Sequence, residues 1–419
     1  MIACANLASL LLARNTRRRS EFATRATLGA TLGRLFRQLI VESAVLVSLG
    51  AAGGIALALG ILGLLKTTTA VHLPRLAHAS MRPAVMAFVI VVSAAVTFFL
   101  TLLPAWRTLR PGLLQDLQGV GRTSAGRGLR LTRRFLVIAQ LALTVVLLAC
   151  AGWMIGSVYL LLHQPLGFVP DRLLMAKAQL SSDSSTKEQA RLYEVKLSQI
   201  SASLRQLPGV VSVAFTDHQP LGHAVNRYTF CSDVHPEQCR QQVNMNPNSY
   251  AISPNYFSTI GQSLLEGRDF NAADDGRNHV AIVNQTLAAR EWPGQSALGH
   301  RVHTGEIRTP EGESWATVVG VVGDVHNYDL VSRPGPDLYI PRAEDPSSFA
   351  RFILNVNGDP GLLKNAARTK LKAEFPEATI FGFETMSEEM SSEVSERVFL
   401  MRVATSFGTV ALFLSVLGV

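Results

Sequence analysis

The sequence is poor in the residues that carry most enzyme and scaffold chemistry. Its 419 residues include only four cysteines, too few for a disulfide scaffold in a chain of this length, and only 17% charged residues. It has no GxxxxGK[ST] phosphate loop, no HExxH metal motif, no GxSxG nucleophile motif and no convincing GxGxxG dinucleotide loop. We therefore predict no catalytic residues, no cofactor and no metal, so any nucleotide hydrolysis must come from a partner.

Acidic residues are almost absent from both ends of the chain. Twenty-eight of the 31 Asp and Glu lie between Asp171 and Glu396, whereas 19 of the 39 Lys and Arg lie outside that block. These basic residues flank apolar runs, a pattern typical of loops that face an anionic cytoplasmic leaflet. The net charge of +8 therefore indicates a lipid bilayer as the partner and argues against nucleic acid.

Long apolar runs account for the mean hydropathy of +0.22. They cover residues 1–13, 39–65, 84–106, 135–162 and 398–419. The three internal runs reach the roughly 20 residues that a helix needs to cross a hydrocarbon core. The outer two are shorter or end within apolar sequence, so we expect truncated spans and a longer protein around this fragment.

The arginines between these runs predict an orientation. Residues 14–38 and 107–134 hold seven Arg each, whereas residues 66–83 hold only three basic residues. By the positive-inside rule the first two segments are cytoplasmic. Alternation of the spans then places residues 163–397 outside. We predict a multi-pass protein of the bacterial inner membrane with a periplasmic domain at 163–397.

The 163–397 segment has the pattern of a folded domain. Short β-branched runs predict strands at 210–216, 279–284, 316–325 and 351–356. Polar amphipathic stretches predict helices at 186–207 and 360–374. The predicted fold is an α-helical membrane bundle plus an α+β domain of βαβ-type units, whose size suits two subdomains.

Two of the cysteines fall in the polar stretch CSDVHPEQC. Cys231 and Cys239 bracket this stretch, and a disulfide can close the short loop if the segment is periplasmic. Two unpaired surface thiols are the alternative. A metal site with His235 is a weaker interpretation, because the spacing is not of the CxxC type and no second cluster is present.

Residues 17–38 predict an amphipathic helix at the membrane surface, with an apolar stripe opposite several arginines. A basic loop lying on lipid explains this pattern, and so does a docking surface for a partner. Gly29 and Gly33 indicate a break or a close backbone approach, which lipid anchoring alone does not require. In the next apolar run, Gly50 and Gly54 form a small-xxx-small face suited to close helix packing, or are ordinary membrane-helix glycines.

The basic stretch also carries a resemblance. It is similar to the signature of the FtsX-like permease domain of MacB-type ABC transporters, through Leu10–Arg14, Arg17–Glu21, Arg25, Leu28–Ala30, Arg34–Leu35, Gln38–Leu39 and Glu42–Ser43. Further along, Leu207–Val210, Ser253–Pro254, Tyr256–Phe257, Gly267–Phe270 and Val319–Val325 resemble landmarks of the MacB-like periplasmic core domain.

The order of the segments resembles the duplicated permeases of that family. It implies the end of a first permease half at 1–106, a basic cytoplasmic linker at 107–134, a transmembrane helix at 135–162, a MacB-like periplasmic core at 163–397 and the start of a second half at 398–419. Within the first half it implies a truncated span at 1–13, a cytoplasmic amphipathic helix at 14–38, and spans at 39–65 and 84–106.

The resemblance implies a permease subunit without enzyme activity, which couples ATP hydrolysis by a cytoplasmic ABC ATPase to movement of the periplasmic domain. The implied coupling-helix residues are Arg17, Arg18, Arg19, Glu21, Arg25, Gly29 and Arg34. A dimer or duplicated pseudo-dimer is expected, together with a periplasmic adaptor or substrate protein. The alternative function is a membrane-bound sensor or receptor for a periplasmic ligand.

Overall fold

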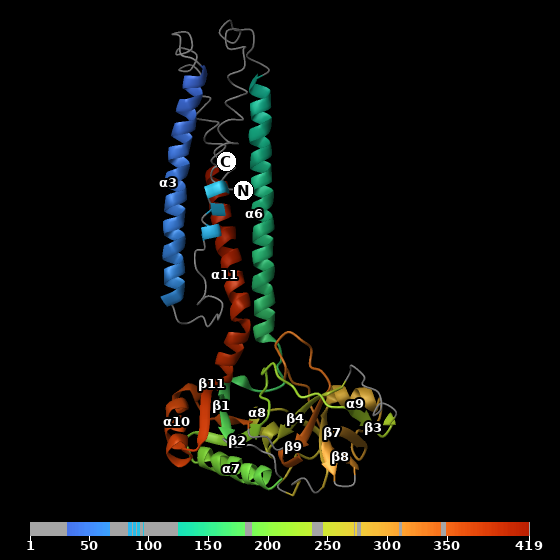
Figure 1. Cartoon of the computed structure of the whole chain (residues 1–419). Helices are drawn as coiled ribbons and strands as arrows, with labels where there is room; N and C mark the ends of the chain where they lie inside the picture. The colour runs from blue at the N-terminus through green and yellow to red at the C-terminus, as the bar shows by residue number, and fades with distance from the viewer. Residues whose placement is uncertain are drawn as a thin grey trace. The chain divides into compact units, whose positions relative to one another are not determined.

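A computed structural model describes residues 32–67, 83–85, 87–88, 90–92, 95, 125–180, 187–236, 246–271, 273–274, 278–309, 312–344 and 349–418. The chain divides into two compact units (Figure 1). The helical unit comprises Met1–Tyr159 and Ser395–Val419, and the α/β unit comprises Leu160–Val394.

Three long helices belong wholly or mostly to the helical unit: α3 (Leu32–Thr67), α6 (Ala125–His163) and α11 (Met386–Gly418). By length and composition, Val137–His163 and Met386–Val416 are suited to cross a membrane. Large apolar side chains on these helices are exposed, and Trp153 of α6 has 85% of its surface accessible. Such a surface is unfavourable in water and favourable in hydrocarbon.

Helices α6 and α11 contact each other within the helical unit. The hydroxyl groups of Thr144 and Ser415 are hydrogen-bonded at 2.8 Å, and Gln140 donates to Ser415 at 3.2 Å. All three side chains are buried. Gly408 supports the approach, because a Cβ there would lie 3.2 Å from Leu148. Small residues and interhelical hydrogen bonds are the usual means by which helices pack in lipid.

The α/β unit is built on one mixed sheet. Its strands are β1 (Leu173–Leu180), β2 (Val210–Thr216), β3 (Phe230–Ser232), β4 (Asn248–Ile252), β5 (Leu264–Gly267), β6 (Val280–Asn284), β7 (Arg301–Thr309), β8 (Gly312–Val322), β9 (Asp337–Pro341), β10 (Phe349–Val356) and β11 (Ala378–Thr385). The order is β11-β1-β10-β2-β4-β9-β6-β8-β7-β3, and β5 pairs with β8. The shorter helices are η1 (Pro170–Arg172), α7 (Lys187–Arg205), α8 (Tyr256–Ile260), α9 (Gln285–Glu291), η3 (Arg342–Glu344), η4 (Pro360–Leu362) and α10 (Leu363–Glu374).

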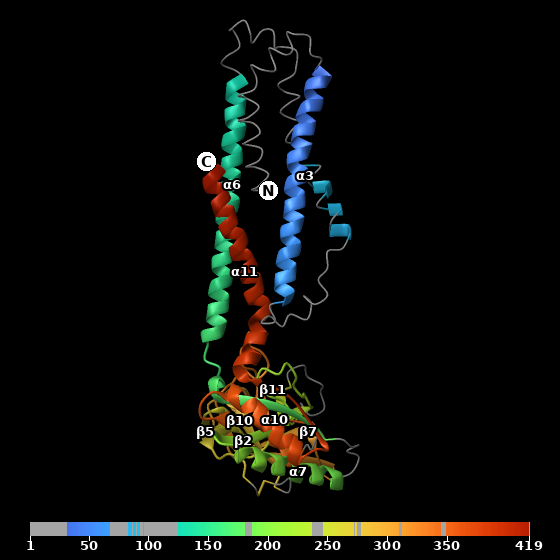
Figure 2. The ribbon, with the colours of Figure 1, turned by 90° about the vertical axis from the view of Figure 1, so that its left-hand side faces the viewer.

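One end of the sheet forms a first subdomain, β11-β1-β10-β2. Helix α7 connects β1 to β2 and helix α10 connects β10 to β11, and in each case one antiparallel strand lies between the connected parallel strands. This arrangement is the split βαβ unit, used twice, as in ferredoxin-like folds. Both helices cover one face of these strands, where Leu197, Phe352 and Leu371 are fully buried (Figure 2).

The second subdomain is inserted between β2 and β10 and has its own core, which includes Val283, Trp292 and Leu338. The sheet continues from the first subdomain to the second through a short antiparallel pairing of β2 with β4, at Thr216 and Ile252. The expected domain of βαβ-type units is therefore present, and the structure adds that it is built on one mixed sheet with two hydrophobic cores.

The long helices extend beyond several of the predicted membrane segments, whose boundaries stay predictions. Helix α3 runs without interruption through the expected end of the amphipathic helix at 38 and the start of a span at 39. Helix α6 begins at Ala125, within the expected linker, and α11 begins at Met386, twelve residues before the expected span at 398. Helix ends depend on capping side chains, which hydropathy does not detect.

Candidate functional site at the root of helix α11

Helix α11 begins at the residue that follows strand β11, so no loop separates the sheet from the helix. The hydroxyl of Thr385 accepts the amide N–H of Glu388 at 3.2 Å, and the Glu388 carboxylate accepts the amide N–H of Thr385 at 2.9 Å. These reciprocal bonds form a capping box. Lys364 of α10 pairs with the same carboxylate, so the first turn of α11 is fixed to both β11 and α10.

Three glutamates gather at the start of α11. They are Glu384 at the end of β11 and Glu389 and Glu393 in the first two turns of α11, and their charges interact. Burial raises the pKa of Glu389, the negative charges of Glu384 and Glu393 raise it further, and Lys177 of β1 opposes them. One turn later, Glu393 pairs with the Nε2 of His223. The first two turns of α11, residues 386–393, are called the root of the helix below. The root therefore makes charged contacts with β1, β11 and the loop that holds His223.

The loop after β2 is held in a strained conformation. Leu221 and His223 have φ angles of 59° and 51°, in the left-handed region that bulky residues avoid. Leu221 is fully buried, and the amide of His223 donates to the carbonyl of Tyr328 at 3.3 Å. The rings of His223 and Tyr328 also meet edge to face, 5.8 Å apart. The interior of the unit thus holds His223 in position for Glu393.

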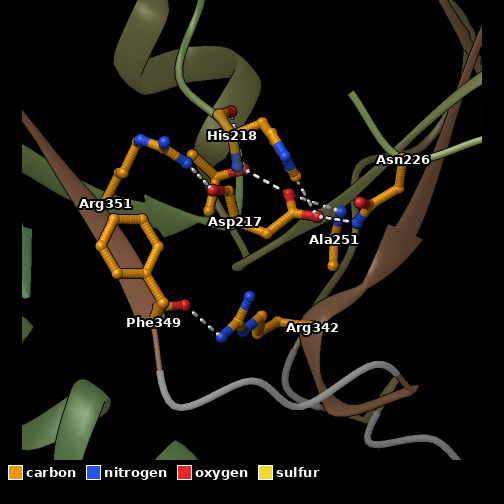
Figure 3. Close-up of polar contacts among 8 residues, drawn as sticks. Asp217, His218, Asn226, Ala251, Arg342, Phe349 and Arg351 are labelled. Atoms are coloured by element: carbon orange, nitrogen blue, oxygen red, sulfur yellow. Dashed lines mark hydrogen bonds and ion pairs between the residues drawn. The ribbon is translucent and has the colours of Figure 1, made fainter. Parts of the chain in front are cut away.

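Arg351 of β10 lies beside the end of β2, at the junction of the two subdomains (Figure 3). Its Nη1 donates to the main-chain oxygen of Asp217, and its guanidinium lies 4.7 Å from the ring centroid of Phe349. Burial lowers the pKa of Arg351, and the negative charges of Asp217 and Glu389 oppose this effect. Arg351 therefore interacts electrostatically with both α11 and the end of β2.

Asp217 joins β2 to the second subdomain (Figure 3). Its Oδ1 accepts the amide N–H of Ala251 in β4 at 3.0 Å, and its Oδ2 accepts the side-chain amide of Asn226 at 3.0 Å. The Nδ1 of His218 lies 3.0 Å from the same Oδ2, at an angle that does not form a hydrogen bond. Asp217 is buried, so these donors replace water around its charge.

A second arginine connects the subdomains near the same place. Arg342 of η3 donates from Nε to Glu194 of α7 at 3.2 Å and from Nη2 to the carbonyl of Phe349 at 2.9 Å. Its side chain is only 2% exposed. Loss of Glu194 would remove this ion pair from a buried arginine, so the contact holds η3 against α7.

The second subdomain buries a carboxyl group. Asp337 is 1% exposed and accepts 2.8 Å hydrogen bonds from the side-chain amides of Asn248 and Asn327. Burial raises the pKa of Asp337 to about 7, the charge of Asp324 adds to the rise, and the two amide donors oppose it.

The segment that follows α6 is fixed into the α/β unit. Gln164 donates to the carbonyl of Leu330, and the amide of Val169 donates to the carbonyl of Ile260 at 2.9 Å. Gly167, between them, has a φ of +80°, and a Cβ there would lie 2.1 Å from the main-chain oxygen of Asp324. Only glycine fits this approach. Both chain connections to the unit are therefore ordered.

The structure places few of the site residues predicted from the sequence. Arg34 is exposed in the first turn of α3, whereas Arg17, Arg18, Arg19, Glu21, Arg25 and Gly29 lie outside the described residues. A Cβ added at Gly50 or Gly54 would meet nothing within 4 Å. No contact of this glycine face is therefore found in the described part of the chain, and its role in helix packing stays a prediction.

Cys231 is fully buried in β3 and is disulfide-bonded. Its predicted partner, Cys239, lies outside the described residues, so the pairing stays a prediction. Across the described ranges, no three His, Cys, Asp or Glu side chains gather in a way that could hold a metal ion.

Two protein-family models match this chain, one in the helical unit and one in the α/β unit. Residues 1–113 match the family model described as FtsX-like permease C-terminal. Residues 162–374, half of the chain, match the model described as MacB-like periplasmic core domain. The chain belongs to the FtsX-like, MacB-type family of ABC transporter permeases. Permeases of this family are inner-membrane proteins with a periplasmic domain, work with cytoplasmic ATPases and are not themselves enzymes.

Two solved structures are similar to this permease. The periplasmic region of MacB from Actinobacillus actinomycetemcomitans is 15% identical, with 54% of this chain and 94% of that chain covered and a TM-score of 0.35. The extracellular domain of the noncanonic ABC-type transporter YknZ from Gram-positive bacteria is 13% identical, with 50% and 100% covered and a TM-score of 0.31. No match was found among curated proteins.

Proposed function

We propose that this permease transmits the nucleotide cycle of a partner ATPase to its α/β unit, with α11 as the transmitting element. The observation that carries the proposal is the direct junction of β11 and α11 at Thr385 and Met386. A helix of 33 residues spans about 50 Å at 1.5 Å per residue. Because no flexible loop separates α11 from the sheet, a displacement of the helix is transmitted to β11.

The fixed connection after α6 supports the same role. If both entry and exit segments are rigid, movement of the helices moves the sheet instead of being absorbed by a linker. The capping box holds one connection, and Gly167 with its neighbours holds the other. The α/β unit then lies on the periplasmic side, as the arginine distribution predicts.

On the cytoplasmic side, the proposed contact with the ATPase is the helix predicted at 17–38, through the seven residues named from the resemblance: Arg17, Arg18, Arg19, Glu21, Arg25, Gly29 and Arg34. The segment order further supports a duplicated permease that works as a dimer or pseudo-dimer. Either export of a cargo or mechanical signalling to a periplasmic partner would use this movement of the α/β unit.

The test is co-purification of the tagged protein from its native host in mild detergent. We expect an ATPase with a phosphate-binding loop to accompany it, and Arg18→Glu with Arg25→Glu to release that ATPase. The matched control is Arg122→Glu with Arg127→Glu, which changes equal charge in the basic linker. Absence of an ATPase, under conditions that preserve other transporter complexes, would instead favour the ligand sensor.

A further inference from the structure

Three buried polar atoms of the α/β unit have no hydrogen-bond partner among the described residues. They are the hydroxyls of Tyr250 and Tyr256 and the Oε1 of Gln262. Tyr250 lies in β4, Tyr256 is the first residue of α8, and Gln262 follows the end of α8. These residues are 1%, 0% and 5% exposed. Because an unpaired polar group in a protein interior costs free energy, several of them together indicate that another molecule completes their hydrogen bonds.

Tyr339 of β9 brings these three residues together. Its ring stacks on that of Tyr250 with 5.5 Å between the centroids, and the ring centroid of Tyr256 is 6.4 Å away. Its hydroxyl accepts the side-chain amides of Asn327 at 2.9 Å and of Gln262 at 3.4 Å. Amide N–H groups cannot accept a hydrogen bond, so neither contact uses the proton of the Tyr339 hydroxyl. Tyr339 therefore adds a donor to the group.

The side-chain amide of Gln262 is fixed in one orientation. Its Nε2 donates to the carbonyl of Gly323 at 2.7 Å and to the hydroxyl of Tyr339. Rotation of the amide would place its oxygen against the oxygen of Gly323, so the unpartnered atom is the side-chain oxygen. The group therefore combines one fixed acceptor with three hydroxyls.

The three tyrosines stay protonated. Burial raises the pKa of Tyr250, Tyr256 and Tyr339, and the charge of Asp337 raises it further. Each hydroxyl is therefore neutral and can both donate and accept. A hard cation would need several carboxylate or carbonyl oxygens, and an anion would be repelled by Asp337. The group therefore suits a small neutral molecule that donates and accepts hydrogen bonds.

The spacing of Tyr250 and Tyr339 suits a single water molecule. The two residues are paired in the parallel ladder of β4 and β9, so their side chains leave the sheet on the same side. Their rings are stacked at 5.5 Å with 27° between the planes, and the hydroxyls therefore lie at roughly the same spacing. This separation is too long for a direct hydrogen bond. Two hydrogen bonds of about 2.8 Å through one water span about 5.5 Å.

We propose that one ordered water molecule is bound among Tyr250, Tyr256, Tyr339 and Gln262. The oxygen of Gln262 accepts one proton of the water, and the tyrosine hydroxyls use its second proton and its two lone pairs. Buried waters commonly make about three hydrogen bonds of this kind to groups that would otherwise be unpaired.

The bound water strengthens the connection between the two subdomains. Strand β4 pairs with β2 of the first subdomain at Thr216 and Ile252. Helix α8 is held to the first subdomain by Asn355 of β10, which donates to the carbonyl of Thr259 at 2.9 Å. Because the water bonds residues from β4, α8 and β9, it completes the packing of these elements where the subdomains meet.

The first test detects the water in the full chain in detergent. X-ray irradiation splits water into hydroxyl radicals, which oxidise the side chains that they touch. In frozen solution radicals from bulk water do not diffuse, so a buried side chain is labelled only by a water bound beside it. We expect mass spectrometry to find Tyr250 and Tyr256 oxidised and Phe352, which is fully buried in an apolar core, unlabelled. Oxidation of both tyrosines no greater than that of Phe352 overturns the proposal.

The second test uses the sign of a stability change. Tyr250→Phe keeps the stacked ring and removes the hydroxyl. With the water bound, the variant loses a hydrogen bond, and the urea midpoint of the α/β unit falls by about 0.3–0.5 M. Tyr328→Phe, a control at a partly exposed ring, leaves the midpoint unchanged. A hydroxyl without a partner would be destabilising, so an equal or higher midpoint in Tyr250→Phe overturns the proposal.

Neither measurement requires nucleotide or an ATPase. Either result therefore leaves the coupling experiment of the proposed function unaffected, and an absent ATPase leaves the water site measurable.

Discussion

Thr385 and Glu388 exchange hydrogen bonds at 3.2 and 2.9 Å and so fix the first turn of α11 to the last residue of β11. Loss of an N-cap hydroxyl costs about 1 kcal/mol of local stability. We expect Thr385→Ala to speed amide exchange at residues 386–389 about fivefold, as that free energy implies. Ser387→Ala, an exposed control in the same turn, should leave exchange unchanged. Equal effects of the two variants would show that the box does not hold the helix.

Gly167 and Gly294 form a matched pair for testing the connection after α6. Both have positive φ, +80° and +75°, but a Cβ at Gly167 would overlap the oxygen of Asp324, whereas one at Gly294 would meet nothing within 4 Å. We expect Gly294→Ala to cost about 1 kcal/mol, the backbone penalty alone. Gly167→Ala should cost at least about 3 kcal/mol, because overlap is added to the same penalty.

Pulse proteolysis of the full chain in detergent checks this pair, through the urea concentration at which the α/β unit becomes cleavable. A Gly167→Ala variant as stable as Gly294→Ala would mean that the segment after α6 can move away from Asp324. This result would exclude a rigid connection between α6 and the α/β unit.

The strands show how much of the fold the sequence reveals. The segment 210–216 is β2 itself, and 279–284 and 351–356 lie within two residues of β6 and β10. All three are rich in β-branched or aromatic residues. In contrast, β1 has the sequence LLMAKAQL, made of good helix formers, and no strand was expected there. Its place between β11 and β10 in the sheet decides its conformation, which local propensity does not indicate.

The candidate site was less accessible to sequence reasoning. Arg351 lies in an expected strand, but its partners Asp217 and Glu389 are 134 and 38 residues away, so no local pattern joins them. One signal was present. The sequence TMSE at Thr385–Glu388 has the T-x-x-E spacing of a capping box and would have predicted the start of α11.

Asp337 predicts a pH-dependent stability for the second subdomain. Its pKa is about 7 in the folded protein, against 3.8 as the usual value, so the folded state binds the proton more tightly than the unfolded state. Stability from this group is therefore fully present below pH 3.8 and is lost as pH rises through 7. We expect a loss of roughly 3–4 kcal/mol between pH 4 and pH 8, measured by urea unfolding of the full chain.

The control for this prediction is Asp337→Asn. Asparagine cannot accept from both Asn248 and Asn327, so the variant should be less stable at pH 5. It should also lose the pH dependence in this window. A variant that keeps the full pH dependence would assign it to other groups.

Asp217 predicts a large effect of a single side chain at the junction of the subdomains. In Asp217→Ala the buried amide of Ala251 and the side chain of Asn226 lose their acceptor. Leaving buried donors unsatisfied should cost about 2–3 kcal/mol in the same proteolysis assay. Asp171→Ala, an exposed aspartate in η1, should change stability by less than about 0.5 kcal/mol. Similar values for both would contradict a structural role for Asp217.

The central claim is that α11 delivers movement to the α/β unit because its junction with β11 is stiff. The most direct test inserts Gly-Gly-Ser-Gly between Thr385 and Met386, and the same four residues after Gly294 as a control in an exposed turn. Hydrogen exchange of residues 187–205 is then compared with and without ATP in the complex with the co-purified ATPase. We predict an ATP-dependent change in the unchanged chain and in the Gly294 insertion, and its loss in the Thr385 insertion while the ATPase stays bound. An ATP-dependent change that survives the Thr385 insertion would contradict transmission through α11.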